Sequence, residues 1–168
     1  YERMAEAAIR NVMTRILEES KISYGIEVAT INPYEHSNKR ITRRALVDLV
    51  LYPDKNIKKE IIYIELKREH PEPGFIVKDL RKMFFDLEEI KGCSFFHYFG
   101  KTDYPSTKER DRARNSIQNK YKEALTSTRK ELRPSIKDRW FMLYILDATK
   151  KEYNCCSIGN MAEEELIT

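Results

Sequence analysis

Two segments of this chain have the apolar pattern of buried strands and yet carry charged side chains at their centres. Residues 46–50 read LVDLV and contain Asp48, and residues 61–67 read IIYIELK and contain Glu65 and Lys67. Moving an unpaired charge out of water costs several kcal/mol in practice. Strands that accept this cost three times within a short span are typical of a site that holds a metal ion or a substrate.

The two segments are expected to form a hairpin, roughly over residues 44–52 and 59–68. The sequence YPDKN between them is rich in turn-forming residues. A turn centred just after it pairs Asp48 directly with Glu65. Opposite residues of an antiparallel pair project to the same face, and Lys67 shares that face because side chains alternate along a strand.

This register brings two carboxylates close together. Opposite Cβ atoms lie about 4.5–5.5 Å apart, so Asp48 and Glu65 repel each other. A divalent cation between them reverses the sign of that interaction, and hard oxygen ligands suit Mg²⁺ or Mn²⁺. Lys67, about 7 Å along the same face, is placed to orient an attacking water or to meet the charge of a phosphate. A solvent-facing hairpin with a plain Glu–Lys pair is the alternative.

Asp48 followed by Glu65-Leu66-Lys67 resembles the active-site signature of the PD-(D/E)XK nuclease superfamily, which includes restriction endonucleases, junction resolvases and repair nucleases. The resemblance covers roughly residues 1–148. It implies a restriction-endonuclease-like α/β fold with an αβββαβ core, in which helices flank a mixed central sheet. Val47 stands where the motif often has proline. Asp54, which does follow a proline, falls in the turn, roughly 20 Å from Glu65 by strand rise.

The resemblance implies a Mg²⁺-dependent nuclease, or one using Mn²⁺, that cuts DNA as an endonuclease, with RNA left open. It assigns Asp48 and Glu65 as metal ligands, adds the backbone carbonyl of Leu66, and gives Lys67 the task of positioning the nucleophile. It also implies an acidic residue on a helix before the sheet. Glu6 is chosen for this, with Glu2 second and a plain solvent-facing glutamate as the alternative. A homodimer or a partner domain is a further expectation.

Composition suits a single domain over residues 1–168, because 41% of the residues are hydrophobic and 35% are charged. No apolar run approaches the roughly 18 residues of a membrane span. Cysteines 93, 155 and 156 cannot all pair, which favours a reducing cytoplasm. The chain begins at Tyr1 without an initiating Met, which suggests a trimmed N-terminus or a domain cut from a longer protein.

The positive charge is concentrated in one part of the chain. Of a net charge of +4, residues 101–139 hold 12 Lys/Arg against 6 Asp/Glu. A basic segment beside an acidic metal site suits a phosphodiester substrate, although an ordinary solvated helix explains the segment equally well. The basic residues considered as nucleic-acid contacts are Arg43, Arg44, Lys78, Lys82, Arg110, Arg112 and Arg114. The helical wheel points both Lys78 and Lys82 outward, so neither is placed in the metal site.

Apolar periodicity outlines the remaining elements. Helices are expected over residues 2–20, 75–90 and 107–130, and further strands over 22–31, 93–99 and 140–147. His97, inside an aromatic strand, is interpreted as a satisfied core histidine. The acidic tail is not assigned to a strand.

A second class of function stays open. A non-catalytic nucleic-acid-binding or protein-interaction module on the same fold would also carry the basic segment. A metal-dependent phosphohydrolase acting on small substrates is less favoured, because the sequence has no Gly-rich phosphate cradle.

Overall fold

The computed structural model describes residues 2–35, 42–52, 61–68, 70–84, 86, 89–90, 92–99, 105–129, 140–147 and 152–160. The helices are α1 (Glu2–Glu19), α2 (Pro73–Phe84) and α3 (Thr107–Arg129). The strands are β1 (Ser23–Ala29), β2 (Tyr34–Glu35), β3 (Thr42–Arg43), β4 (Leu46–Tyr52), β5 (Ile62–Arg68), β6 (Gly92–Phe99), β7 (Trp140–Asp147) and β8 (Glu152–Asn160).

A mixed six-stranded sheet, in the order β1-β4-β5-β6-β7-β8, forms the centre of the molecule. The pairs β1·β4, β4·β5 and β7·β8 are antiparallel, whereas β5·β6 and β6·β7 are parallel. Parallel neighbours need a crossover connection, which α2 and α3 provide. With the short β2·β3 ribbon left out, the chain begins α1, β1, β4, β5, α2, β6 and continues with α3, β7 and β8. The expected α/β class with a mixed, helix-flanked sheet is confirmed.

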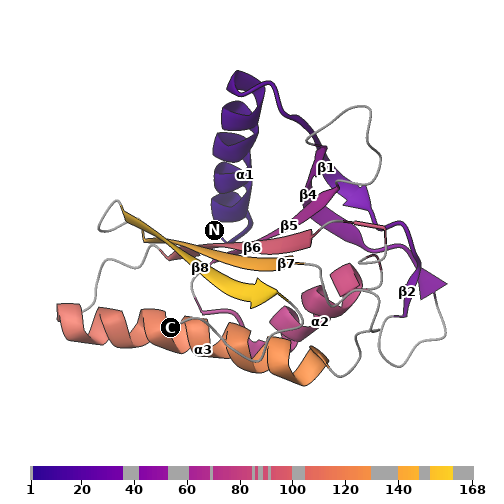
Figure 1. Ribbon diagram of the computed structural model, residues 1–168. Coiled ribbons are helices and arrows are strands. Elements are labelled where there is room, and N and C mark those ends of the chain that lie inside the picture. The colour runs from indigo at the N-terminus through magenta and orange to yellow at the C-terminus, as the bar shows by residue number, and fades with distance from the viewer. Residues whose placement is uncertain are drawn as a thin grey trace.

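Helices cover both faces of the sheet, with α1 on one side and α2 and α3 on the other (Figure 1). Alternation along β5 divides its side chains between two apolar cores. Tyr63 packs with residues of α2 and α3, whereas Ile64 and Leu66 pack with Leu17 of α1. This confirms the expected alternation and puts Glu65 on the α2 and α3 side.

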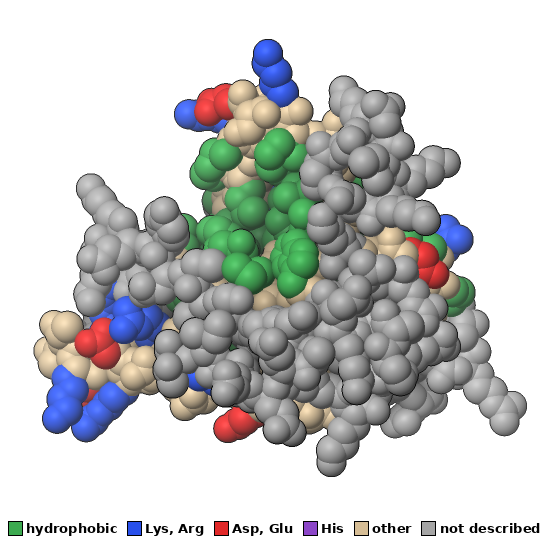
Figure 2. Space-filling model, viewed as in Figure 1, with side chains coloured by type: hydrophobic (Ala, Val, Ile, Leu, Met, Phe, Trp, Pro, Cys, Tyr) green, Lys and Arg blue, Asp and Glu red, His purple; other side chains and the backbone are tan. Residues whose placement is uncertain are grey.

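The apolar stripe of α1 is wider than the surface that the helix buries. Leu17 is buried, but Val12 is 61% exposed and Ile16 is 55% exposed. Both line an apolar groove of about 630 Å³ between α1 and strands β6 and β7, and the hydrophobic side chains gathered there stand out in Figure 2. No helix among the described residues is long and apolar enough to cross a membrane.

Two expectations from periodicity are wrong. The helix predicted to reach residue 90 ends at Phe84, and the tail contributes β8, which pairs with β7 at the edge of the sheet. The buried carboxylate of Asp86 accepts hydrogen bonds from the amides of Ile31 (2.5 Å) and Asn32 (2.7 Å) and from the Tyr63 hydroxyl (2.7 Å). These bonds from distant parts of the chain hold Asp86 in a turn, where local periodicity would have continued the helix.

Candidate active site

The register of β4 against β5 is the one predicted. The pairs are Leu49 with Ile64, Val50 with Tyr63 and Leu51 with Ile62. The turn that joins the two strands, including Asp54, lies outside the described residues. Continued by one position, the register sets Asp48 opposite Glu65.

At this position β4 and β5 are joined through the side chain of Asp48 and not through a regular backbone pair. Its Oδ2 accepts a hydrogen bond of 2.9 Å from the backbone amide of Leu66. On the other side of β4, the pairing with β1 passes from Ile26–Leu49 to Val28–Val47. Asp48 therefore lies at an irregularity of the sheet, where a side chain can turn toward the neighbouring strand.

The residue of β1 beside this irregularity is Glu27, which has a φ of 50°. A left-handed conformation costs a residue other than glycine roughly 1–2 kcal/mol. The Glu27 carboxylate lies 2.8 Å from the guanidinium of Arg10, which ties the bend to α1. The backbone of β1 therefore departs from a regular strand beside Asp48, and the Arg10–Glu27 ion pair holds α1 at that position.

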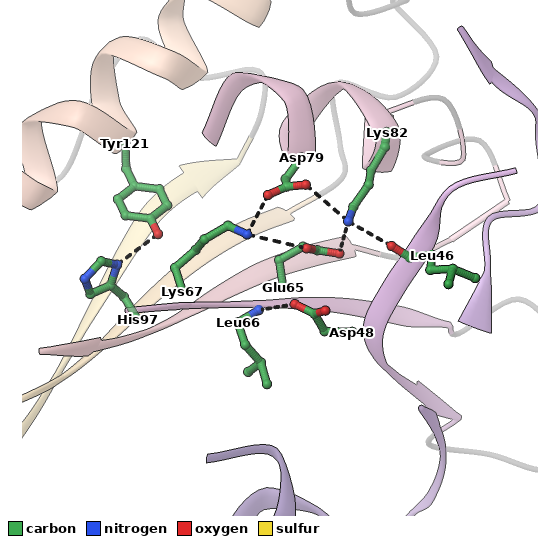
Figure 3. A network of polar contacts seen from close by, with 9 residues as sticks. All are labelled: Leu46, Asp48, Glu65, Leu66, Lys67, Asp79, Lys82, His97 and Tyr121. Carbon is green, nitrogen blue, oxygen red and sulfur yellow. Dashed lines mark hydrogen bonds and ion pairs between the residues drawn. The ribbon is translucent and has the colours of Figure 1, made fainter. Parts of the chain in front are cut away.

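Glu65, Lys67, Asp79 and Lys82 form what we name the acid–lysine cluster (Figure 3). Lys67 Nζ lies 2.6 Å from Asp79 Oδ2 and 4.0 Å from Glu65 Oε2. Lys82 Nζ lies 2.6 Å from Glu65 Oε1 and 3.2 Å from Asp79 Oδ1. Glu65 is only 1% exposed, and Asp79 and Lys82 are 7% exposed, so solvent screens these ion pairs weakly.

The prediction that Lys82 points outward is wrong. Its side chain is buried, and Nζ donates a further hydrogen bond of 2.8 Å to the backbone carbonyl of Leu46. The long stem of lysine carries the ammonium group from the flank of α2 inward, and the start of β4 meets it there. Lys78, one turn earlier, is exposed as predicted.

Asp79 is a site residue that the sequence analysis missed. It comes three residues after Ile76 and directly before Leu80, both fully buried, so it lies beside the apolar stripe of α2. A carboxylate at that helical position was the available signal. The helix sequence alone does not distinguish such a carboxylate from one on the polar face.

Burial raises the pKa of Glu65 to about 8, and Asp79 and Asp48 add to the rise while Lys82 and Lys67 oppose it. Burial alone would lower the pKa of each lysine. The neighbouring carboxylates outweigh burial and raise the pKa of both Lys67 and Lys82 above its usual value. Both lysines therefore keep their positive charge at neutral pH.

The structure places Glu6 within electrostatic reach of the same site. Glu6 is half-buried on α1, and burial raises the pKa of its carboxyl group. Lys67 lowers this pKa and Asp48 raises it, which locates both charges near Glu6. Glu6 therefore lies within electrostatic range of Asp48 and Lys67.

Helix α3 approaches the site from the side opposite α1. His97 pairs with Lys67 in the parallel register, is fully buried, and has its Nδ1 3.0 Å from the Tyr121 hydroxyl of α3. This agrees with a core histidine. Lys120, the preceding residue on α3, donates to the backbone carbonyl of Pro71 at 3.2 Å. The helix is therefore fixed against the end of β5.

The predicted nucleic-acid contacts lie on three parts of the molecule: the segment that leads into β4, helix α2 and helix α3. Arg43 ends β3 and Arg44 is exposed just before β4. On α3, Arg112 is exposed, Arg110 is partly buried, and Arg114 lies 3.6 Å from Asp111. Among these basic residues, Lys82 contacts Glu65.

The donor set fits Mg²⁺ in chemical type. Within the described residues, no three His, Cys, Asp or Glu side chains converge as a metal-binding group. Mg²⁺, however, is commonly held by one or two carboxylates, with water and substrate phosphate completing its shell. Asp48 and Glu65, with the Leu66 carbonyl, meet that requirement.

The charge balance around the site also favours a cation. Four carboxylates (Glu6, Asp48, Glu65 and Asp79) lie near three positively charged groups (Lys67, Lys82 and Arg68). Fully ionised, this set carries one excess negative charge, so a bound cation would meet a net attraction.

These features define an α/β protein whose mixed sheet carries a buried acid–lysine cluster next to a sheet irregularity. Comparison with protein-family models, with curated proteins and with solved structures found no match. The chemistry of the site is therefore the basis on which a function is assigned.

Proposed function

We propose that this protein is a metal-dependent nuclease that hydrolyses phosphodiester bonds in DNA, on a restriction-endonuclease-like fold. The observation that carries the proposal is that Asp48, Glu65 and Lys67 lie close together at one place in the sheet. Glu65 is buried on β5, and Lys67 is partly buried on the same strand. The chain order α1, β1, β4, β5, α2, β6 supports the fold assignment, because it is the order that the sequence resemblance implies.

Asp48 and Glu65 would hold Mg²⁺ or Mn²⁺, with the backbone carbonyl of Leu66 beside them. A bound divalent cation would lower the pKa of a water molecule and neutralise charge on the phosphate. The Asp48 carboxylate is already oriented by the Leu66 amide, so one of its oxygens is held while the carboxylate keeps further acceptor capacity.

Lys67 contributes a fixed positive charge. Its raised pKa keeps it protonated, so it serves as a hydrogen-bond donor and not as a general base. Asp79 holds the ammonium group at 2.6 Å and thereby limits the positions it can adopt. A cation held in this way can orient a water molecule or stabilise negative charge developing on a phosphate.

The alternative function is a nucleic-acid-binding module without catalysis. The observation in its favour is that the Glu65 carboxylate already has an internal cation, Lys82, at 2.6 Å. A closed pair of this kind could serve as a structural element of the sheet. Such a module would bind polyanions in a salt-dependent manner and would not depend on Glu65.

A cleavage assay separates the two functions. Supercoiled plasmid, single-stranded DNA and RNA would each be incubated with Mg²⁺, Mn²⁺ or EDTA. We expect metal-dependent cutting of DNA by the wild type and a loss of about a hundredfold or more in Asp48→Ala and in Lys67→Ala. Arg15→Ala, at an exposed position of α1, is the control expected to cut normally.

Each other result has a definite meaning. Salt-sensitive binding without cleavage by any metal would favour the binding module. Cleavage that survives Asp48→Ala would place the active site elsewhere. Cutting of RNA in preference to DNA would keep the site and change the substrate.

A further inference from the structure

Lys82 is held by three oxygen atoms from three different elements. Its Nζ lies 2.6 Å from Glu65 Oε1 on β5, 3.2 Å from Asp79 Oδ1 on α2, and 2.8 Å from the carbonyl oxygen of Leu46 on β4. The contact with Leu46 is a hydrogen bond, and the two contacts with carboxylate oxygens are close ion pairs. Figure 3 shows the three acceptors grouped around this nitrogen.

The shortest of these contacts is with the carboxylate that a metal ion would need. Mg²⁺ binds carboxylate oxygens at about 2.0–2.1 Å and requires near-octahedral geometry. An ammonium nitrogen 2.6 Å from the same oxygen would both crowd and repel the cation. Lys82 and a divalent ion are therefore competitors for Glu65 Oε1.

We propose, on the basis of the nuclease function proposed above, that Lys82 is an internal counter-ion which Glu65 exchanges for the divalent cation. In the metal-free protein, Lys82 neutralises a carboxylate that is almost completely buried. When the cation binds, Lys82 leaves Oε1, keeps its contacts with Asp79 and Leu46, and the cation takes its place. Metal affinity is thus set in part by the displaced lysine.

The geometry identifies Lys82, and not Lys67, as the exchanging group. Lys67 Nζ is 4.0 Å from Glu65 and has its close contact, 2.6 Å, with Asp79 Oδ2. Lys82 has the close contact with Glu65 and two other acceptors that remain after it withdraws. Asp79 holds one lysine on each of its carboxylate oxygens, so α2 can retain both cations while β5 binds the metal.

The test is a titration of Mn²⁺ alone, without nucleic acid, into EDTA-treated and dialysed protein at one fixed pH, followed by calorimetry. We expect Lys82→Met to bind Mn²⁺ about tenfold more tightly than the wild type, since no lysine has to be displaced. Lys67→Met, which removes an equal charge from a more distant position, should tighten binding less. Lys78→Met, exposed on the same helix, should leave the affinity unchanged.

A wild-type crystal structure with Mn²⁺ tests the exchange without any substitution, and so holds even if the Lys82 variant does not fold. We expect Mn²⁺ on Glu65, with Lys82 Nζ no longer within hydrogen-bond distance of Oε1 and still near Asp79. Mn²⁺ on Glu65 with that contact intact would overturn the exchange. Equal or weaker binding by Lys82→Met, or equal gains in Lys82→Met and Lys67→Met, would overturn it as well.

Mn²⁺ binding by the wild type and the variants distinguishes a failure of the exchange from a failure of the nuclease proposal. If the wild type binds Mn²⁺, Asp48→Ala does not, and Lys82→Met behaves like the wild type, then only the exchange is wrong. If neither the wild type nor any variant binds Mn²⁺, the metal site itself is wrong and the exchange falls with it.

Discussion

Glu65 experiences opposing influences that decide its protonation. It is 1% exposed, which penalises its charged form, and Asp48 and Asp79 act in the same direction. Lys82 and Lys67 favour the charged form, but the effect of burial is larger. In the metal-free protein, Glu65 therefore binds a proton more tightly than an exposed glutamate does. Below about pH 8 metal binding must displace that proton, and above it Lys82 is the cation paired with the ionised carboxylate.

This residue predicts how stability depends on pH. The carboxyl pKa is about 8 in the folded chain against the ordinary 4.5 expected in the unfolded chain. Between those values the folded state binds more protons, so its free energy of unfolding falls as the pH rises. We expect metal-free wild type to lose stability from about pH 5 to pH 8, and Glu65→Gln to lose less over that range.

Urea denaturation at several pH values, with EDTA present, measures this difference. Glu19→Gln removes an exposed carboxylate of α1 and should keep the wild-type slope. If wild type and Glu65→Gln showed parallel pH profiles, Glu65 would have an ordinary pKa in the folded chain.

At the scale of elements, the sequence predicted what depends on local pattern. Strand β7 has the predicted bounds, Trp140–Asp147, because an uninterrupted apolar run marks it. The β4·β5 register was accessible because alternation and turn-forming residues fix it together. Strand β8 was missed because its apolar alternation is broken at the adjacent Cys155 and Cys156. Its pairing with β7 depends on the edge of an existing sheet.

The same distinction applies to the site. Asp48, Glu65 and Lys67 could be recognised because charges are conspicuous within apolar strands. Asp79 and Lys82 could not be, because a helix normally carries charges on its polar side. Which flank of α2 is buried depends on how the helix crosses β4 and β5, and one helix sequence does not contain that information.

The end of α1 allows an independent prediction about an element boundary. Lys21 has a φ of 57°, its amide donates to the Glu18 carbonyl at 3.0 Å, and the Ile22 amide donates to the Leu17 carbonyl at 2.9 Å. This is a Schellman motif with lysine where glycine is favoured. We expect Lys21→Gly to stabilise the protein by about 1 kcal/mol, because glycine adopts this conformation without strain.

Thermal or urea denaturation of the variant checks this value. Lys78→Gly, an exposed position in the interior of α2, is the matched control and should destabilise by about 1 kcal/mol. If both substitutions destabilised the protein equally, Lys21 would not occupy a left-handed cap.

For the whole molecule, the sheet separates an apolar side from a basic side. The groove beside α1 is lined by hydrophobic residues, whereas α3 lies across the opposite face (Figure 1). Within Thr107–Arg129, seven Lys/Arg and three Asp/Glu give a net charge of +4, equal to that of the entire chain. The acid–lysine cluster lies on the same side of the sheet as α3 (Figure 3).

Arg112 tests whether α3 is the surface that attracts nucleic acid. It is exposed and lines a surface pocket with Asn115, Asn119 and Lys120. Each phosphate contact contributes about −0.9 to the slope of log K against log salt concentration for duplex DNA. We expect Arg112→Ala to weaken duplex binding and to reduce the steepness of that slope by about 0.9, with EDTA present to prevent cleavage. Fluorescence anisotropy across a salt series provides the measurement.

Arg15→Ala, on the exposed side of α1, removes the same charge from the far side of the sheet. A diffuse attraction by net charge would make the two substitutions equivalent. Contact through α3 would change the slope for Arg112→Ala and leave that for Arg15→Ala at the wild-type value. If the salt dependence of binding were equal in the wild type and both variants, Arg112 on α3 would not contact the nucleic acid. Arg44, at the start of β4, would then be the next residue to substitute.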